Sequence, residues 1–218
     1  MKIAVLGTGM VGHALAGKLV SLGHEVTMGS RESGNPKATQ WAEEAGPLGH
    51  AGSFAEACSA ATLVINATPG TVSLAVLAEA GAENLNGKVL LDVSNPLDGS
   101  SGFPPSLTVC NTDSIAETIQ RTYPGVQVVK SLNTVTAPVM VDPGRLPAPH
   151  DIFMAGNDAG AKSTVSAVLQ EFGWEPERIR DLGRLDAARA MEMWLPLWLR
   201  IFVQQPQGKM FNIAIISE

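Results

Sequence analysis

The sequence is short of the residues on which several enzyme mechanisms depend. Among 218 residues there are one tyrosine, two cysteines and four histidines. The residue four positions beyond Tyr123 is Gln127, so the Tyr-x-x-x-Lys pair of short-chain dehydrogenases is absent. The histidines are scattered and neither cysteine has the spacing of a metal or redox motif. We therefore expect no metal site, no Ser-His-Asp triad and no catalytic side chain.

Positive charge and long apolar runs are also scarce. The 15 Lys and Arg against 21 Asp and Glu give a net charge of −6, and no basic run offers a surface for nucleic acid. The most apolar stretch, residues 191–203, contains charged residues and Pro196, so we expect no membrane segment. The apolar N-terminus is interpreted as structure rather than as a signal peptide, and the two cysteines as reduced thiols. These features predict a cytoplasmic protein.

What the sequence does contain is typical of an α/β protein: 45% hydrophobic residues, 17% charged residues and 22 glycines. Short apolar runs alternate with helical patterns, and the predicted strands cover residues 2–6, 25–28, 63–67, 89–93 and 126–129. This alternation predicts a Rossmann-type, mainly parallel sheet with helices on both faces. Strands near 151–155 and 178–182 extend the sheet, so residues 1–185 form one nucleotide-binding domain. Residues 134–150 contain four prolines and are predicted to form a long loop.

Several helix ends can be predicted from local residue patterns. Gly23 suits the end of a helix whose apolar face includes Leu15 and Leu19. Asn35-Pro36 has the sequence of an N-cap and first helical residue, and Ser53-x-x-Glu56 that of a capping box.

A glycine motif follows the first predicted strand. Gly7, Gly9 and Gly12 form G-x-G-x-x-G, with Thr8, Met10 and Val11 between them, and a helix and a second strand follow. In that context the glycines permit a tight turn and a close approach of the pyrophosphate, which the partial positive charge at the helix N-terminus attracts. A glycine-rich packing turn would not require this spacing. The motif predicts a dinucleotide site.

The end of the second strand indicates which dinucleotide is bound. An NAD enzyme places Asp or Glu there for the ribose hydroxyl, whereas this sequence has Ser30 and Arg31, with Lys37 nearby. A hydroxyl, a guanidinium and an ammonium suit the 2′-phosphate of NADP. The alternative is a solvated loop arginine, and neighbouring Glu32 fits either interpretation.

Two further turns are expected to border NADP(H), because ligands of open α/β sheets bind at the carboxyl ends of strands. The first contains Ala67, Thr68 and Pro69, and the second contains Asn95. Ordinary strand-to-helix turn chemistry is the alternative for each of these residues.

Residues 186–218 are expected to form a short C-terminal helical appendage. From residue 186 to 202 apolar side chains occupy almost every helical face, so the helix must be buried by its own domain, a ligand or another subunit. Pro196 should break or kink it, and Arg189 and Glu192 are spaced to pair, unless they form only a solvated contact. We predict a homodimer in which this segment, including Trp194, supplies dimer contacts and part of the acceptor pocket.

The chain also resembles the NADPH-dependent reductases of the deazaflavin coenzyme F420 and related bacterial NADP oxidoreductases. The similarity rests on residues 1–31, Asn66 to Pro69, 129–137, and Arg189, Glu192 and Pro196. It implies that the segment containing Asn133, Thr134, Val135 and Ala137 approaches the nicotinamide and the second ring. It also implies hydride transfer by alignment of two rings, which requires no positioned acid or base.

The expected function is therefore an NADP(H) oxidoreductase that exchanges hydride with a small planar molecule, with coenzyme F420 as the leading co-substrate. A reductase of a flavin, a quinone or a small carbonyl or imine compound is the second hypothesis. A non-catalytic NADP sensor is the third, because a Rossmann fold alone does not establish catalysis.

Overall fold

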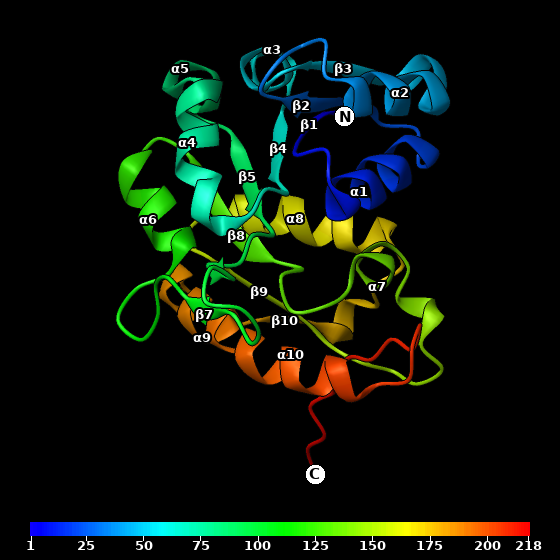
Figure 1. The fold of residues 1–218 in the computed structure, drawn as a ribbon, viewed down its shortest axis with the longest axis vertical. Helices are drawn as coiled ribbons and strands as arrows, with labels where there is room; N and C mark the ends of the chain where they lie inside the picture. Colours follow the sequence, from blue (N-terminus) through cyan, green and yellow to red (C-terminus); the bar gives the residue numbers. More distant parts are fainter.

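An eight-stranded sheet forms the centre of the protein in the computed structural model, which describes residues 1–218 (Figure 1). The strand order is β10-β9-β8-β5-β4-β1-β2-β3, and all neighbours are parallel except the antiparallel pair β8–β9. The strands are β1 Lys2–Leu6, β2 Glu25–Ser30, β3 Gly49–Ser53, β4 Leu63–Asn66, β5 Val89–Asp92, β8 Gln127–Ser131, β9 Ile152–Gly156 and β10 Ile179–Asp181.

Helices cover both faces of the sheet, so two apolar cores form (Figure 1). Alternate residues of β1 show the division, because Ile3 and Val5 join one core while Ala4 and Leu6 join the other. The helices are α1 Met10–Ser21, α2 Pro36–Ala45, α3 Phe54–Ala60, α4 Gly70–Ala80, α5 Ala82–Leu85, α6 Ile115–Thr122, α7 Ala137–Val141, α8 Ala159–Glu171, α9 Ala188–Met193 and α10 Leu195–Gln204.

This architecture confirms the predicted Rossmann-type sheet. The seven predicted strands are present within one or two residues of their expected ends. The edge strand β3 was not predicted, because Gly49-His50-Ala51-Gly52-Ser53 contains neither a branched nor an aromatic apolar residue.

The prediction of a long loop over residues 134–150 was wrong in part. The segment contains α7 and a short 3-10 turn at Pro143–Arg145. Pro138 lies in the first turn of α7, where the missing N–H costs no helical hydrogen bond. The prolines therefore mark the starts of short helical pieces as well as irregular chain.

The predicted helix ends are confirmed. The Asn35 Oδ1 atom accepts from the backbone N–H groups of Lys37 and Ala38 at 3.0 and 3.3 Å. Ser53 and Glu56 form the reciprocal capping box of α3. Gly23 follows α1 with a φ of +86°, a conformation that favours glycine.

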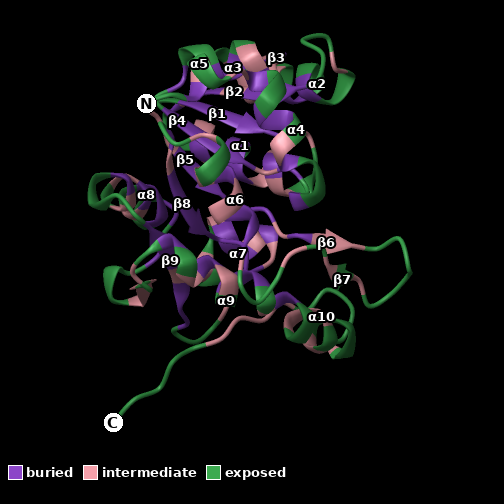
Figure 2. Cartoon of the chain, turned by 90° about the vertical axis from the view of Figure 1, so that its left-hand side faces the viewer, coloured by how far each residue is buried: buried purple, intermediate pink, exposed green.

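The C-terminal segment forms two helices rather than one. Helix α9 ends at Met193 and α10 begins at Leu195, with Pro196 in its first turn, so the predicted break at the proline is confirmed. Helix α9 packs against the body of the protein, whereas α10 buries only Leu195 and lies beside the small hairpin of β6 Leu97–Asp98 and β7 Ser106–Leu107 (Figure 2). No helix combines the length and apolarity needed to cross a bilayer.

Candidate cofactor and acceptor site

The glycine motif forms the turn between β1 and α1, and each glycine meets different surroundings. Gly7 has a φ of +120°, and a Cβ there would lie 2.8 Å from the carbonyl oxygen of Ala67. A Cβ on Gly12 would lie 2.0 Å from the Gly7 carbonyl oxygen. Gly9 has no atom within 4 Å of its Cβ position. Gly7 and Gly12 are therefore required by packing, while Gly9 faces open space.

The N-terminus of α1 has the properties of an anion site. Its N-cap is Gly9, which makes no side-chain hydrogen bond to the helix, and the first turn contains no acidic residue. The first amides of the helix are thus available to a ligand, and the helix dipole adds partial positive charge. Thr8 and Val11 are half-buried and Met10 is exposed beside this end. The arrangement fits a pyrophosphate.

The residues predicted to read the 2′-phosphate lie at and beyond the end of β2. The Ser30 hydroxyl donates to the Glu32 carbonyl at 2.6 Å, and this bond leaves its oxygen able to accept but not to donate elsewhere. The Arg31 side chain is 81% exposed, and its nearest acidic partner, Glu79, is 4.0 Å away. Lys37 is exposed at the start of α2. Both cationic side chains are therefore free to move onto a phosphate.

The turns that follow β4 and β5 are locked together. A Cβ on Gly70 would lie 2.5 Å from the Asn95 carbonyl oxygen, which accepts from the Gly70 N–H at 3.0 Å. In the first turn, the Thr68 hydroxyl donates to the Asn66 side-chain oxygen at 2.6 Å. Pro69 is exposed beside them. These contacts give the two turns one fixed arrangement at the carboxyl edge of the sheet.

Asn95, Asn133 and Met191 connect three segments that are distant in the sequence. The Asn95 amide nitrogen donates to the Asn133 carbonyl at 2.9 Å, and the Asn133 amide nitrogen donates to the Asn95 side-chain oxygen at 2.9 Å. The Asn133 nitrogen also donates to the Met191 carbonyl at 3.0 Å. The structure thus brings together the predicted cofactor turn, the predicted acceptor segment and helix α9.

Buried polar atoms without a hydrogen-bond partner concentrate at this junction. All such side-chain atoms belong to the segments after β5 and β8 or to the junction of α9 and α10: Ser94 Oγ, Asn133 Oδ1, Thr134 Oγ1, Thr136 Oγ1, Trp194 Nε1 and Trp198 Nε1. Leaving a buried polar group unpaired costs about 1–3 kcal/mol. Their concentration therefore indicates a ligand site that contains both donors and acceptors. Val135, between the two threonines, and Ala137, after the second, are also buried.

A buried ionic triad lies directly behind these atoms. The Lys130 ammonium at the end of β8 is 2.8 Å from a carboxylate oxygen of Asp92 and 2.8 Å from one of Glu192, and all three side chains are at most 1% exposed. Burial opposes the charge on Lys130, but the two carboxylates outweigh it and leave the pKa of Lys130 raised. Burial raises the pKa of Glu192 as well.

The triad was not among the site residues predicted from the sequence. Its visible mark is a charged residue at the end of an apolar strand, as in Leu90-Leu91-Asp92 and Val128-Val129-Lys130. The expected pairing of Arg189 with Glu192 was wrong, because Arg189 binds Glu117 of α6, with Nε 2.9 Å from Oε2. Glu192 instead binds Lys130, so the two residues anchor α9 in different directions.

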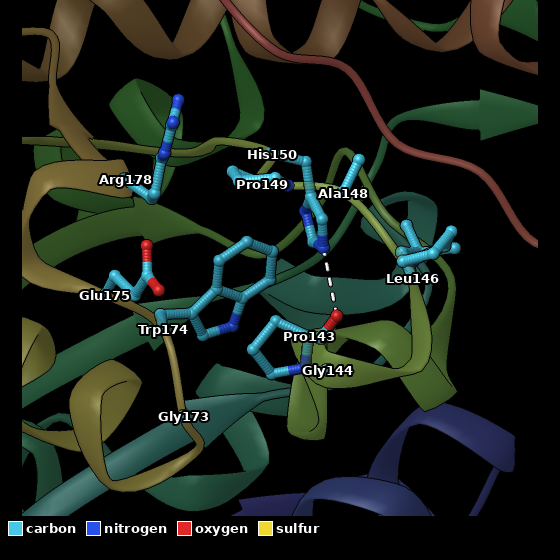
Figure 3. Close-up of a pocket in the computed structure, with 11 residues that line it drawn as sticks. Pro143, Gly144, Leu146, Ala148, Pro149, His150, Gly173, Trp174, Glu175 and Arg178 are labelled. Atoms are coloured by element: carbon cyan, nitrogen blue, oxygen red, sulfur yellow. Dashed lines mark hydrogen bonds between the residues drawn. The ribbon is translucent and has the colours of Figure 1, made fainter.

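A separate cavity of about 200 Å³ lies between the 143–150 segment and the chain before β10 (Figure 3). Its two polar aromatic side chains are already paired: His150 Nε2 with the Pro143 carbonyl, His150 Nδ1 with Asn212, and Trp174 Nε1 with the Met140 carbonyl. None of the buried, unpaired polar side-chain atoms lies in this cavity, unlike at the junction of Ser94 and Asn133. No cluster of three or more His, Cys, Asp or Glu is placed to hold a metal ion.

Comparison with known proteins gives consistent matches. Residues 2–96 match the family described as NADP oxidoreductase, coenzyme F420-dependent. The chain is 30% identical over 213 residues to the F420-dependent NADP reductase of Methanothermobacter marburgensis, covering 94% of this chain and 93% of that protein. It is also 30% identical over 207 residues to metalloreductase STEAP3 of Rattus norvegicus, but these span 90% of this chain and only 38% of that protein.

Two solved structures also resemble this protein. An Arthrobacter sp. FB24 protein proposed to be an F420-dependent NADP reductase matches with a TM-score of 0.91 and 48% identity over the whole of both chains. A reductive aminase from Aspergillus terreus, solved with NADPH, matches with a TM-score of 0.66 and 21% identity over 93% of this chain and 62% of that one. The second match supports the fold alone.

Proposed function

Because this chain belongs to the coenzyme F420-dependent NADP oxidoreductases, we propose that it transfers hydride between NADPH and the deazaflavin ring of coenzyme F420. The chain is an NADP-dependent oxidoreductase, and the identity of the acceptor is the proposed part. The observation that supports a planar heteroaromatic acceptor is the set of buried, unpaired donors and acceptors around Asn133 and Trp194. Such a ring presents carbonyl oxygens and ring nitrogens that match them.

NADP(H) would be held along the carboxyl edge of the sheet. The Gly7–Gly12 turn and the α1 amides would bind the pyrophosphate, and the turns at 67–69 and Asn95 the nicotinamide half. Arg31 and Lys37 would bind the 2′-phosphate, and Ser30 would join them by turning its hydroxyl away from the Glu32 carbonyl. The bound cofactor supplies the hydride. The protein supplies alignment of the two rings, which requires rigid support on both sides of the junction.

The acceptor would lie against residues 133–137 and Trp194. The two buried indole N–H groups of Trp194 and Trp198 have no partner, and each is a donor only. A ring with carbonyl groups on one edge would satisfy them. Residues 186–218 are proposed to complete this pocket.

The same segment supports the proposal of a homodimer. Helix α10 exposes Leu197 at 53%, Phe202 at 43% and Val203 at 55%, and Leu195 is its one buried residue. Each such side chain gains about 1.5–3 kcal/mol on full burial, so a second copy of α10 is a suitable cover. Light scattering of a Leu197→Asp variant tests this: the parent should have twice the monomer mass and the variant the monomer mass.

Turnover with a panel of acceptors tests the function. Purified protein with NADPH and oxidised F420, FMN, a soluble quinone or a cyclic imine is followed by loss of nicotinamide absorbance. The proposal expects kcat/KM for F420 to exceed that for each of the others by at least about tenfold, or 1.4 kcal/mol. A higher value for a flavin, a quinone or an imine identifies the second hypothesis instead, and NADPH binding without turnover of any acceptor identifies a sensor.

A further inference from the structure

Lys130 makes three interactions inside the sheet that account for its whole donor capacity. Its ammonium donates to Asp92, Glu192 and the Ser94 carbonyl, which matches the three N–H donors of a lysine. The side chain is fully buried. A buried ion pair seldom makes a protein more stable than packed apolar residues of similar volume would. Stability alone is therefore a weak explanation for this triad.

The Asp92 side of the triad fixes Ser94. The Asp92 Oδ1 atom accepts from the Ser94 N–H at 3.2 Å and from the Asn66 amide nitrogen at 2.9 Å, while Lys130 holds the Ser94 carbonyl. Both backbone polar groups of Ser94 are thus bound to the triad. Its hydroxyl remains buried and without a partner.

The Glu192 side fixes helix α9. The Glu192 carboxylate accepts from the Ile115 N–H at 2.9 Å at the start of α6 and from Lys130. One residue earlier, the Met191 carbonyl accepts from the Asn133 amide nitrogen at 3.0 Å. A carbonyl only accepts, so the amide nitrogen of Asn133 must face Met191, and its Oδ1 faces away without a partner.

The triad therefore supports two groups with complementary free atoms. It binds the backbone of Ser94, whose hydroxyl is unpaired, and it anchors α9, whose Met191 carbonyl binds Asn133 and leaves the Asn133 amide oxygen unpaired. A carboxamide needs this combination, because its oxygen accepts from a hydroxyl while its NH₂ group donates to an amide oxygen. The nicotinamide ring carries one carboxamide. Fixing that group determines which face of the ring points toward the acceptor.

We propose that Lys130 is a positioning residue for the nicotinamide: through Asp92 and Glu192 it holds Ser94 and Asn133 where they bind the carboxamide. The proposal rests on the proposed NADP(H) site and adds residues that the glycine motif and the 2′-phosphate pocket do not involve. Removal of the Lys130 charge should leave phosphate binding in place and release the nicotinamide ring.

Calorimetry with two ligands separates these effects. NADP⁺ and 2′-phospho-ADP-ribose share every phosphate and differ only in the nicotinamide. The Kd of 2′-phospho-ADP-ribose divided by the Kd of NADP⁺ is therefore a ratio that reports the contribution of the ring alone. In Lys130→Met we expect this ratio to fall about tenfold, equivalent to about 1.4 kcal/mol, with the Kd of 2′-phospho-ADP-ribose within threefold of the parent value. Ser94→Ala, which removes only the hydroxyl, should lower the ratio about fivefold.

Lys162→Met is the matched control. Lys162 also donates to one aspartate, Asp181 at 2.8 Å, and to one backbone carbonyl, that of Gly183, but it connects α8 to the end of β10 and the turn after it. We expect no change in the ratio for this variant. An equal loss of both ligands in Lys130→Met, or an unchanged ratio, would mean that the triad is structural and would overturn the proposal.

Two further measurements keep the test decisive. If Lys130→Met does not fold, Glu192→Gln replaces it, because it removes one charge and keeps the shape; a ratio lowered at least threefold supports the proposal and an unchanged ratio overturns it. Transfer from (4R)- and (4S)-deuterated NADPH should also lose stereoselectivity in Lys130→Met, which a purely structural defect would not cause. Calorimetry requires no acceptor, so a failure to reduce F420 would refute the proposed function without affecting this result.

Discussion

The glycine turn allows a prediction in which neighbouring positions respond differently to the same small change. Adding one methyl group at Gly12 places a Cβ 2.0 Å from the Gly7 carbonyl oxygen, whereas ordinary contact begins at 3.4 Å. The helix or the turn must therefore move by about 1.4 Å, the difference between these distances. Overpacking of this kind costs about 1–3 kcal/mol, and a chain of this size loses about 2–4 °C in Tm per kcal/mol.

Gly9→Ala should weaken NADPH binding without lowering stability. Its Cβ meets no atom within 4 Å, and its φ of −88° suits any residue, so the fold should tolerate the methyl group with a change in stability below about 1 kcal/mol. The methyl group would occupy the open space in front of the α1 amides. We expect the affinity for NADPH to fall by at least about tenfold, or 1.4 kcal/mol.

Gly17→Ala provides the control for both variants. Gly17 lies within α1, also has no neighbour within 4 Å of its Cβ position, and is two turns from the proposed phosphate site. Alanine in a helix interior is favoured over glycine by about 0.5–1 kcal/mol, so Tm should rise by about 1–4 °C and binding should not change.

The assays are differential scanning fluorimetry for Tm and NADPH fluorescence for the affinity. Gly12→Ala should lower Tm by about 2–12 °C and weaken binding, and Gly9→Ala should weaken binding alone. Parent affinity in a folded Gly9→Ala protein would refute the assignment of this turn to the pyrophosphate. Parent stability in Gly12→Ala would refute the packing argument.

Three further predictions use separate features. Arg31→Ala should raise the Kd of NADP⁺ about 10- to 150-fold and leave the Kd of NAD⁺ nearly unchanged, since a charge-assisted hydrogen bond is worth about 1.5–3 kcal/mol. Equal losses of affinity for the two cofactors in titration calorimetry would exclude a contact between Arg31 and the 2′-phosphate. Burial raises the pKa of Cys58 to about 12, so a thiol reagent at pH 8 should label only the exposed Cys110 in the folded protein, as counted by mass spectrometry. Burial raises the pKa of Glu192 above the ordinary 4.5, so the folded state binds the proton more tightly than the unfolded state does. The free energy of unfolding should therefore fall as pH rises from 4.5 through the raised pKa. Glu192→Gln should flatten that part of the pH profile in urea denaturation, and an unchanged slope would contradict a raised pKa of Glu192.

The sheet was predictable because its strands and turns are encoded locally. The run ending at Leu6 and the glycines after it specify strand, turn and helix within a dozen residues. Asn35 and Ser53 likewise act on amides two or three positions away. In contrast, the antiparallel direction of β9 depends on the path of α7 and the segment after it, which no local pattern records.

The interior of the candidate site was less predictable because its contacts join residues far apart in the chain. Lys130 is 38 positions from Asp92 and Asn133 is 58 positions from Met191. Arg189 and Glu192 show the difficulty clearly, since helical spacing favoured their pairing but each found a partner on another element. Tertiary contacts of this kind override a local pair worth only about 0.2–0.5 kcal/mol.

The structure divides the proposed work of the site between two kinds of support. The phosphate side would rely on backbone amides and on exposed cations such as Arg31, which suit a ligand that arrives from solvent. The ring side relies on groups such as Ser94 and Asn133, whose backbone or amide nitrogen is already bound and whose remaining polar atom is buried. Hydride transfer is sensitive to small displacements of the rings, so a rigid frame is needed where the rings meet and not where the phosphates bind. Lys130 provides such rigid support because all three of its donors are paired. Breaking one of its interactions would leave a buried charge uncompensated, so other arrangements of Ser94 and helix α9 are unfavourable.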